Sequence, residues 1–328
     1  MSTRGDDAGG NRTAEPVPDI SVVVPAYNEA SSVPELIERI SAAVAPLGTF
    51  EIIIVDDGST DDTWGALQIA ARDHVEVVGV RLQRNFGQHP AVSAGFAAAR
   101  GLVIVTLDAD LQNPPEEIPK LVARLGPDCD VASGWRQTRI DGLARRIPSR
   151  LINIAIAKMT GVKLNDYGSM LRAYKRNVVE QVQDCPEMNK FTAALVSWLG
   201  VRIVEVPVEH HPRAAGRSRY SYWRLMKINF DLLTGFSTDV LQIVSLVGIV
   251  MSALGVAAGL SLAVWRLFAG TGPTGLNTFA ALLLLVGGLQ LAAIGMVGEY
   301  VGRVFVQVQG RPYFIVAEQL GRADDPGL

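Results

Sequence analysis

The sequence predicts an α/β catalytic domain with a mostly parallel sheet, followed by an interfacial helix and a two-helix transmembrane hairpin. Short β-branched runs alternate with helical patterns from Ile20 to about Val208, as is typical of parallel α/β sheets. Polar clusters follow the ends of three of the apolar runs. Two long stretches, 240–264 and 279–297, carry no charged residue and come late in the 328-residue chain. Each is long enough to cross a bilayer, which takes roughly 20 apolar residues.

The first half of the domain is expected to contain four strands with three helices between them. The apolar residues of the first helix recur at helical spacing, and a Ser-Thr-Asp-Asp stretch suited to an N-cap precedes the second helix. In such sheets ligands bind beyond the carboxyl ends of the strands. The expected strands are 20–24, 51–55, 75–82 and 102–107, and the expected helices are 33–47, 63–72 and 90–100.

The chain divides into five segments by composition. A polar segment, 1–19, is expected to be a disordered tail, and residues 20–209 form the catalytic domain. Residues 210–238 contain a basic loop and an amphipathic helix that we interpret as interfacial, with a surface helix of the soluble domain as the alternative. Residues 239–304 contain two transmembrane helices, about 240–266 and 277–298, and residues 305–328 form a cytoplasmic C-terminal segment.

The distribution of charge predicts the partners and the topology. The net charge of −3 argues against a nucleic-acid-binding protein, which usually has an excess of basic residues. Arginines and lysines gather on the two outer flanks of the hairpin, whereas its connecting loop, 269–277, holds no charged residue. By the positive-inside rule, the catalytic domain and both termini are expected to be cytoplasmic, at the cell membrane.

Two carboxylates two residues apart, Asp108 and Asp110, follow the apolar run that ends at Leu107. Placed at a strand end, they can reach a single hard cation, and Mg²⁺ and Mn²⁺ favour oxygen ligands and share their coordination shell with substrate phosphates. Such a cation neutralises a diphosphate leaving group. An acidic turn without metal is the alternative.

The ends of two other expected strands carry candidate nucleotide-binding residues. Asp56 can accept from the N–H groups of a uracil or guanine base, and Gly58 permits close approach of the backbone. Tyr27 can stack on a base and Glu29 can bind a ribose hydroxyl. The alternative at Asp56 and Gly58 is an acidic turn with an N-cap. The alternative at Tyr27 and Glu29 is a plain strand-to-helix turn.

Several motifs together resemble glycosyltransferase family 2, the inverting enzymes with a GT-A fold, and within it the polyprenyl-phosphate glycosyltransferases. Dolichol-phosphate mannose synthases are more distantly similar. The resemblance covers roughly residues 20–316. It rests on the segments Val24-Pro-Ala-Tyr-Asn-Glu29, Asp56-Asp-Gly-Ser59, Arg84-Asn-Phe-Gly-Gln-His89, Asp108 to Glu117, Asp166 to Tyr174, Arg213 to Ser221 and Gly298-Glu-Tyr-Val-Gly-Arg303 followed by Arg311-Pro312.

The resemblance implies roles for individual residues. Asp110, Asp166 and Arg136 are implied at the reacting centre, and metal ligation is implied for Asp108, Asp110 and Gln112. Nucleotide-sugar binding is implied for Pro25, Tyr27, Glu29, Asp56, Asp57, Asn85, Gln88 and Asp108. The acceptor phosphate is implied to enter at Arg213, Ser218, Arg219 and Tyr220, where Arg219 replaces the lysine usual in relatives and can still bind phosphate.

The expected function is inverting transfer of a sugar from a nucleotide-sugar, a UDP-sugar rather than a GDP-sugar by preference, to undecaprenyl or decaprenyl phosphate. Mg²⁺ or Mn²⁺ is the expected cofactor, the lipid bilayer is an expected partner, and a homo-oligomer is compatible with the sequence. Two alternatives are a processive polysaccharide synthase and a non-catalytic membrane protein that binds nucleotide-sugars. The chain lacks the Gln-x-x-Arg-Trp motif of processive synthases, and its acidic and basic clusters are those that turnover requires.

Overall fold

The computed structural model of the chain describes residues 16–136, 162, 164–185, 192–210, 239–269 and 275–321. Its centre is an eight-stranded sheet with the strand order β7-β5-β6-β4-β1-β2-β3-β8. The strands are β1 (Ile20–Ala26), β2 (Phe50–Asp56), β3 (Val77–Leu82), β4 (Val103–Thr106), β5 (Val131–Arg136), β6 (Arg172–Lys175), β7 (Ile203–Val208) and β8 (Val316–Leu320).

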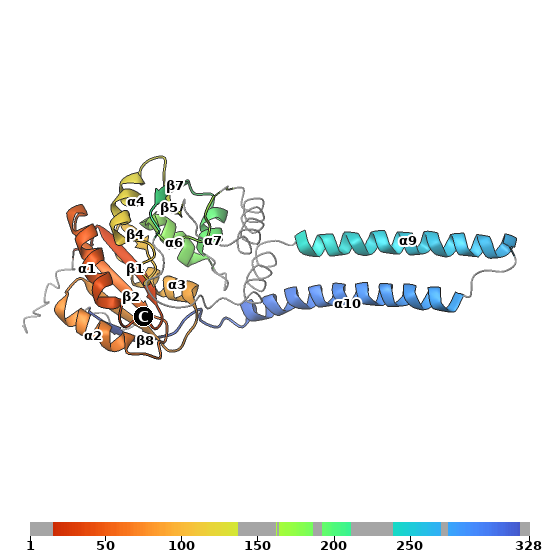
Figure 1. Ribbon diagram of the computed structural model, residues 1–328, viewed down its shortest axis with the longest axis horizontal. Coiled ribbons are helices and arrows are strands. Elements are labelled where there is room, and N and C mark those ends of the chain that lie inside the picture. The colour runs from red at the N-terminus through yellow and green to blue at the C-terminus, as the bar shows by residue number, and fades with distance from the viewer. Residues whose placement is uncertain are drawn as a thin grey trace, which may run out of the picture.

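Helices cover both faces of this sheet (Figure 1). Helices α1, α2 and α4 pack on one face, and α3, α6 and α7 pack on the other. The bounds are α1 (Val33–Val44), α2 (Thr63–Asp73), α3 (Gln88–Ala98), α4 (Ile118–Arg124), α6 (Arg176–Asp184) and α7 (Thr192–Trp198), with short 3₁₀ turns at Ala45–Leu47 and Pro115–Glu117. The three layers bury both faces of the central strands, which explains their continuous β-branched runs.

All four strands and three helices expected in the first half of the domain are present. The central strands pair in parallel, β1 with both β2 and β4, and β2 with β3, so their carboxyl ends lie at one edge of the sheet. The expected bounds differ from the observed ones by a few residues. The third strand begins at Val77 rather than residue 75, and the first helix ends at Val44, where a 3₁₀ turn containing Pro46 follows.

The sheet is mixed, because β6 and β8 pair antiparallel to their neighbours. The most distant pairing in sequence joins β8 to β3, with Arg81 opposite Glu318. Part of the segment expected to be a cytoplasmic C-terminal extension is therefore an edge strand of the catalytic sheet. Its closing position beside β3 covers the edge that would otherwise present unpaired backbone groups.

Two long helices, α9 (Asp239–Ala269) and α10 (Gly275–Val308), lie side by side and project away from the sheet (Figure 1). Large apolar side chains on both are exposed, among them Trp265, Phe268 and Leu291. In the part of the chain that the structure describes, one stretch, Val286–Val308, is long and apolar enough to cross a membrane, whereas the apolar stretch Leu246–Gly255 of α9 is shorter. The expected second span therefore stays a prediction.

Candidate functional site

The site forms where the carboxyl ends of β1, β2 and β4 meet at one edge of the sheet. Ala26 at the end of β1 pairs with Asp56 at the end of β2, and Asp108 follows β4, which pairs with the other side of β1. Parallel pairing places all three acidic or polar clusters at the same edge, as the sequence predicts.

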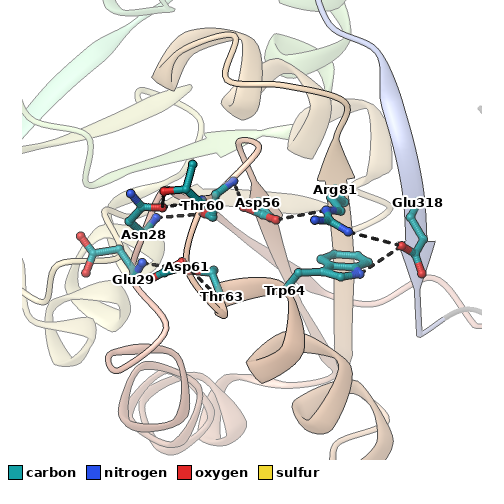
Figure 2. Close-up of polar contacts among 10 residues, drawn as sticks. Asn28, Glu29, Asp56, Thr60, Asp61, Thr63, Trp64, Arg81 and Glu318 are labelled. Carbon is teal, nitrogen blue, oxygen red and sulfur yellow. Dashed lines mark hydrogen bonds and ion pairs between the residues drawn. The ribbon is translucent and has the colours of Figure 1, made fainter.

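The loops that follow β1 and β2 are joined by side-chain hydrogen bonds (Figure 2). Asn28, in the left-handed backbone region with φ of 57°, accepts at Oδ1 from the Thr60 amide (2.8 Å) and the Thr60 hydroxyl (3.2 Å). The Glu29 amide donates to Thr63 Oγ1 (3.0 Å). The Glu29 carboxylate points away from this joint in Figure 2, and its Oε2 accepts from the Ser32 hydroxyl at 3.1 Å.

Asp56 is fully buried at the end of β2, and its two carboxylate oxygens have different surroundings. Oδ1 accepts from the Ser59 amide at 2.9 Å. Among the described residues Oδ2 accepts no hydrogen bond, and its cationic neighbour, Arg81 Nε, lies 3.7 Å away. A buried carboxylate oxygen without a donor is costly, so Oδ2 is suited to receive an N–H group from a ligand.

Asp57, next in the chain, is turned toward a neighbouring loop. Its Oδ1 accepts from the Phe86 amide (2.7 Å) and its Oδ2 from the Gly87 amide (2.9 Å). Burial raises the pKa of this carboxyl, and the two backbone hydrogen bonds oppose that rise. With both oxygens bonded to the backbone, Asp57 shapes the loop that carries Asn85 and leads to Gln88, both of which are exposed.

Gly58 explains how these two loops approach so closely. Its φ is 63°, and a Cβ there would lie 2.4 Å from the backbone carbonyl carbon of Arg84. Only glycine fits both the backbone conformation and the space. The close approach that the sequence predicts at this position is therefore made to another loop of the protein.

The acidic pair after β4 is held by amides. Asp108 Oδ1 accepts from Gln88 Nε2 at 2.7 Å, and its Oδ2 accepts from Asn113 Nδ2 at 3.4 Å. Asp110 Oδ1 accepts from the backbone N–H of Gln112 at 3.2 Å, and Leu111 between these two residues has a φ of 56°. This turn gathers Asp108, Asp110 and Gln112, and it adds Gln88 from α3 to the same cluster.

These residues fit a hard divalent cation by the chemistry of their donors, because carboxylate oxygens are what Mg²⁺ and Mn²⁺ prefer. No group of three or more His, Cys, Asp or Glu residues that could hold a metal occurs in the described ranges. A cation held by Asp108 and Asp110 would complete its shell with other oxygens, such as that of the Gln112 side chain or those of a diphosphate.

Arg136 at the end of β5 and Asp166 form a bidentate ion pair. Arg136 Nε donates to Asp166 Oδ2 at 2.7 Å and Nη2 donates to Oδ1 at 3.0 Å, while the side chain of Asp166 is only 2% exposed. Glu205 of β7 accepts at Oε1 from the amides of Asn165 (2.8 Å) and Asp166 (3.0 Å), which fixes the backbone of this loop. Two of the three residues that the family resemblance implies at the reacting centre, Arg136 and Asp166, are thus in direct contact.

Two basic residues, Arg172 of β6 and His89 of α3, lie close to one another. Arg172 of β6 is 2% exposed, and its Nη2 donates to the Tyr167 carbonyl at 2.9 Å. Burial and the nearby Arg172 charge lower the pKa of His89 to about 4. His89 is therefore neutral at pH 7.

The remaining predicted residues belong to two groups, one at the end of β1 and one outside the described residues. Pro25 and Tyr27 are partly exposed at the end of β1, on the same edge as Asp56. The four residues predicted to bind the acceptor phosphate, Arg213, Ser218, Arg219 and Tyr220, lie outside the described residues, as does the expected interfacial helix.

Four residues that lie around the site were not predicted from the sequence: Asn28, Arg81, Glu205 and Glu318. Arg81 is the one charged residue of β3, which pairs with the strand that ends at Asp56, and it is the charged position at the carboxyl end of the expected strand 75–82. Glu318 carried no signal in the sequence, because its strand pairs with residues more than 230 positions earlier.

The model of "Glycosyl transferase family 2" matches residues 21–183. The chain is 46% identical over 317 residues to undecaprenyl-phosphate 4-deoxy-4-formamido-L-arabinose transferase of Pseudomonas paraeruginosa, covering 95% of this chain and 93% of that protein. It is 44% identical over 308 residues to the protein of the same name from Klebsiella pneumoniae, covering 92% and 94%.

Solved structures are similar at lower identity. Glucosyl-3-phosphoglycerate synthase from Mycobacterium tuberculosis, in complex with Mn²⁺, UDP and glucosyl-3-phosphoglycerate, is 23% identical with a TM-score of 0.47, covering 66% of this chain and 78% of that one. The family match and the mostly parallel sheet confirm the GT-A-like α/β fold. The chain belongs to glycosyltransferase family 2 and is a glycosyltransferase, similar over almost its whole length to enzymes named for transfer to undecaprenyl phosphate.

Proposed function

We propose that this glycosyltransferase moves a sugar from a UDP-sugar to undecaprenyl phosphate, with inversion at the anomeric carbon, on the cytoplasmic face of the membrane. The observation that carries the proposal is the 46% identity over 95% of the chain to a transferase named for that acceptor. The same name makes 4-deoxy-4-formamido-L-arabinose the first sugar to test. Decaprenyl phosphate is an acceptor of the same chemistry.

The donor nucleotide is proposed to lie at the edge formed by β1 and β2. Asp56 Oδ2 accepts no hydrogen bond among the described residues and is suited to the imide N–H of uracil. Tyr27, partly exposed beside it, offers a ring for stacking, and the Glu29 carboxylate offers an acceptor for a ribose hydroxyl. The whole joint is fixed before any ligand binds, because Asn28 and Thr60 tie the two loops together.

Asp108 and Asp110 are proposed to hold Mg²⁺ or Mn²⁺ together with the donor diphosphate, with Gln112 as a further oxygen donor. When bound, the cation neutralises the charge of the departing nucleoside diphosphate. Gln88 and Asn113 keep the Asp108 carboxylate oriented through their amide hydrogen bonds. The chain thus contributes two carboxylates in a preformed turn.

The acceptor needs no strong general base. The second pKa of a phosphate monoester is near 6, so the nucleophile is largely dianionic at pH 7. Both oxygens of Asp166 accept from the Arg136 guanidinium, which makes Asp166 a poor proton acceptor and a good positioning residue for Arg136. We assign Arg136 to a phosphate of the donor or acceptor, because a guanidinium binds phosphate bidentately.

A single in-line displacement by the acceptor phosphate inverts the anomeric carbon. The work of the protein is to place two anionic groups in line and to offset their charge. The basic loop that contains Arg213, Ser218, Arg219 and Tyr220 is proposed to bind the acceptor phosphate, since it follows β7 directly and precedes α9 in the chain.

The sheet topology supports two membrane crossings. β7 and β8 belong to one sheet, so residues 208 and 316 lie on the same side of any membrane. A chain that leaves a side and returns to it crosses an even number of times. If Val286–Val308 crosses, another crossing must occur between residues 209 and 285, and α9 is the long helix described in that interval. Arginines outside the hairpin favour the cytoplasm for the catalytic domain.

A transfer assay tests the proposal. The full-length chain in membranes or detergent is incubated with undecaprenyl phosphate, Mg²⁺ and UDP-sugars labelled in the sugar, with UDP-4-deoxy-4-formamido-L-arabinose first. We expect label in the lipid extract as a single monoglycosylated product. A product that lengthens with time would support a processive synthase instead. UDP binding with no transfer of any sugar to lipid would overturn the proposed reaction.

A further inference from the structure

We propose that Glu318, in the C-terminal strand β8, is a positioning residue of the donor site. It acts through Arg81 to keep Oδ2 of Asp56 available as a hydrogen-bond acceptor for the nucleotide base. This inference rests on the proposed donor site at Asp56, and it assigns the strand that follows the membrane helices to that site.

Three residues form a row across the sheet. Asp56 of β2 is in register with Arg81 of β3, and Arg81 is in register with Glu318 of β8 (Figure 2). Register fixes the row because neighbouring strands in a sheet lie about 4.8 Å apart. Glu318 therefore lies one strand beyond the cation that faces the proposed base-binding carboxylate.

Arg81 is shared between the two carboxylates. Its Nε is 3.7 Å from Asp56 Oδ2, and its Nη1 is 3.9 Å from Glu318 Oε2. Both distances exceed those of a charge-assisted hydrogen bond, which are about 2.7–2.9 Å. The guanidinium is thus close enough to offset the charge of Asp56 without donating a hydrogen bond to its Oδ2.

The position of Arg81 is set by Trp64 as well. The guanidinium carbon lies 5.5 Å from the Trp64 ring centroid, in the range of a cation–π contact. Trp64 is 6% exposed, and its Nε1 donates to Glu318 Oε2 at 3.1 Å. Glu318 Oε2 therefore contacts both Trp64, whose ring lies against the guanidinium, and Nη1 of that guanidinium.

The consequence concerns ligand binding more than stability. The Arg81 and Glu318 side chains are 39% and 46% exposed, and exposed ion pairs contribute little to folding. Among the described residues, Arg81 is paired with Asp56 and Glu318, so without the Glu318 charge Asp56 is its remaining anionic partner there. The guanidinium is then expected to move inward and donate to Oδ2, which would occupy the oxygen that the base N–H requires.

The variants Glu318→Gln, Arg81→Ala and their combination test this coupling. Glu318→Gln keeps an oxygen that accepts from Trp64 and removes the charge that holds Arg81. The readout is the Kd of UDP with MgCl₂, measured by calorimetry on the full-length protein in detergent, together with steady-state kinetics. Glu180→Gln is the matched control. Glu180 of α6 forms a similarly exposed ion pair with Arg176, and α6 carries none of the residues proposed to bind the donor.

We expect Glu318→Gln to raise the Kd of UDP and the donor KM about tenfold, the effect of losing one hydrogen bond to a charged group, with kcat and the acceptor KM unchanged. In the Arg81→Ala background the same substitution should change Kd less than twofold, because its effect passes through Arg81. Glu318→Asp, which restores the charge, should recover part of the affinity.

Equal UDP affinity of Glu318→Gln and the wild type would overturn the inference, as would an equal loss in the presence and absence of Arg81. A wild-type protein that binds no UDP would instead overturn the proposed donor site. The two failures are therefore distinguishable in one titration series.

Discussion

At the scale of single residues, Arg136 and Asp166 are both implied at the reacting centre by the family resemblance, and the structure pairs them with each other. Asp166 is 2% exposed and both of its oxygens accept from the guanidinium, so we propose that it acts through Arg136. We expect Asp166→Asn to lower kcat at least a hundredfold and to lower the apparent Tm, because a buried pair that loses one partner costs about 3–5 kcal/mol. Steady-state transfer assays and tryptophan fluorescence measure the two effects.

Arg136→Lys distinguishes positioning from direct catalysis by Asp166. If Asp166 acts through Arg136, the double variant Arg136→Lys/Asp166→Asn should be no slower than the slower single variant. Multiplicative losses, or a near wild-type kcat for Asp166→Asn, would contradict this assignment.

The acidic turn after β4 gives a second prediction at this scale. Asp110→Asn keeps the size of the side chain and removes the charge that a cation requires, so we expect loss of most of kcat with an unchanged apparent Tm. Activity of the wild type should vanish in EDTA and return with Mg²⁺ or Mn²⁺. Full activity in the chelator would show that the Asp108–Asp110 turn does not work through a metal.

At the scale of elements, we propose that the joint between the loops after β1 and β2 shapes the edge assigned to the donor. The Asn28 side chain accepts two hydrogen bonds from Thr60, and Asn28 has a left-handed backbone. We expect Asn28→Gly and Asn28→Ala both to weaken UDP binding severalfold, because the loops separate. Alanine should also lower the apparent Tm further, since it adds the cost of a left-handed conformation, roughly 1 kcal/mol.

Calorimetry with UDP and thermal unfolding measure these two effects separately. Thr60→Val removes one of the two donors and serves as the companion variant, with an expected loss smaller than that of Asn28→Gly. An Asn28→Gly protein that binds UDP as tightly as the wild type would show that the joint does not shape the donor edge.

At the scale of the whole molecule, the return of the chain to the sheet at β8 constrains the membrane topology. Because β7 and β8 share one sheet, the crossings between them must be even in number. We expect a reporter inserted between α9 and α10 to be outside the cytoplasm, and reporters at both termini to be inside. A cytoplasmic signal from the insertion between the helices would remove the two-span proposal.

The sequence by itself determined the features that depend on local pattern. Apolar runs and helical spacing between Ile20 and Leu107 predicted four strands and three helices, and the motifs at the strand ends predicted the family. Strand ends were predictable because parallel pairing carries every carboxyl end to one edge, so Asp56 and Asp108 could be placed together without coordinates.

Only the tertiary structure decided how those residues are used. Asp57 and Asp56 are adjacent in an acidic pair, yet Asp57 bonds to the loop at Phe86 and Gly87, while Asp56 has one oxygen that accepts no hydrogen bond among the described residues. The pairing of Glu318 with Arg81 joins strands more than 230 residues apart. The physical reason is the same in both cases: local pattern sets which face a side chain takes, whereas its partner is set by packing between segments that are distant in the chain.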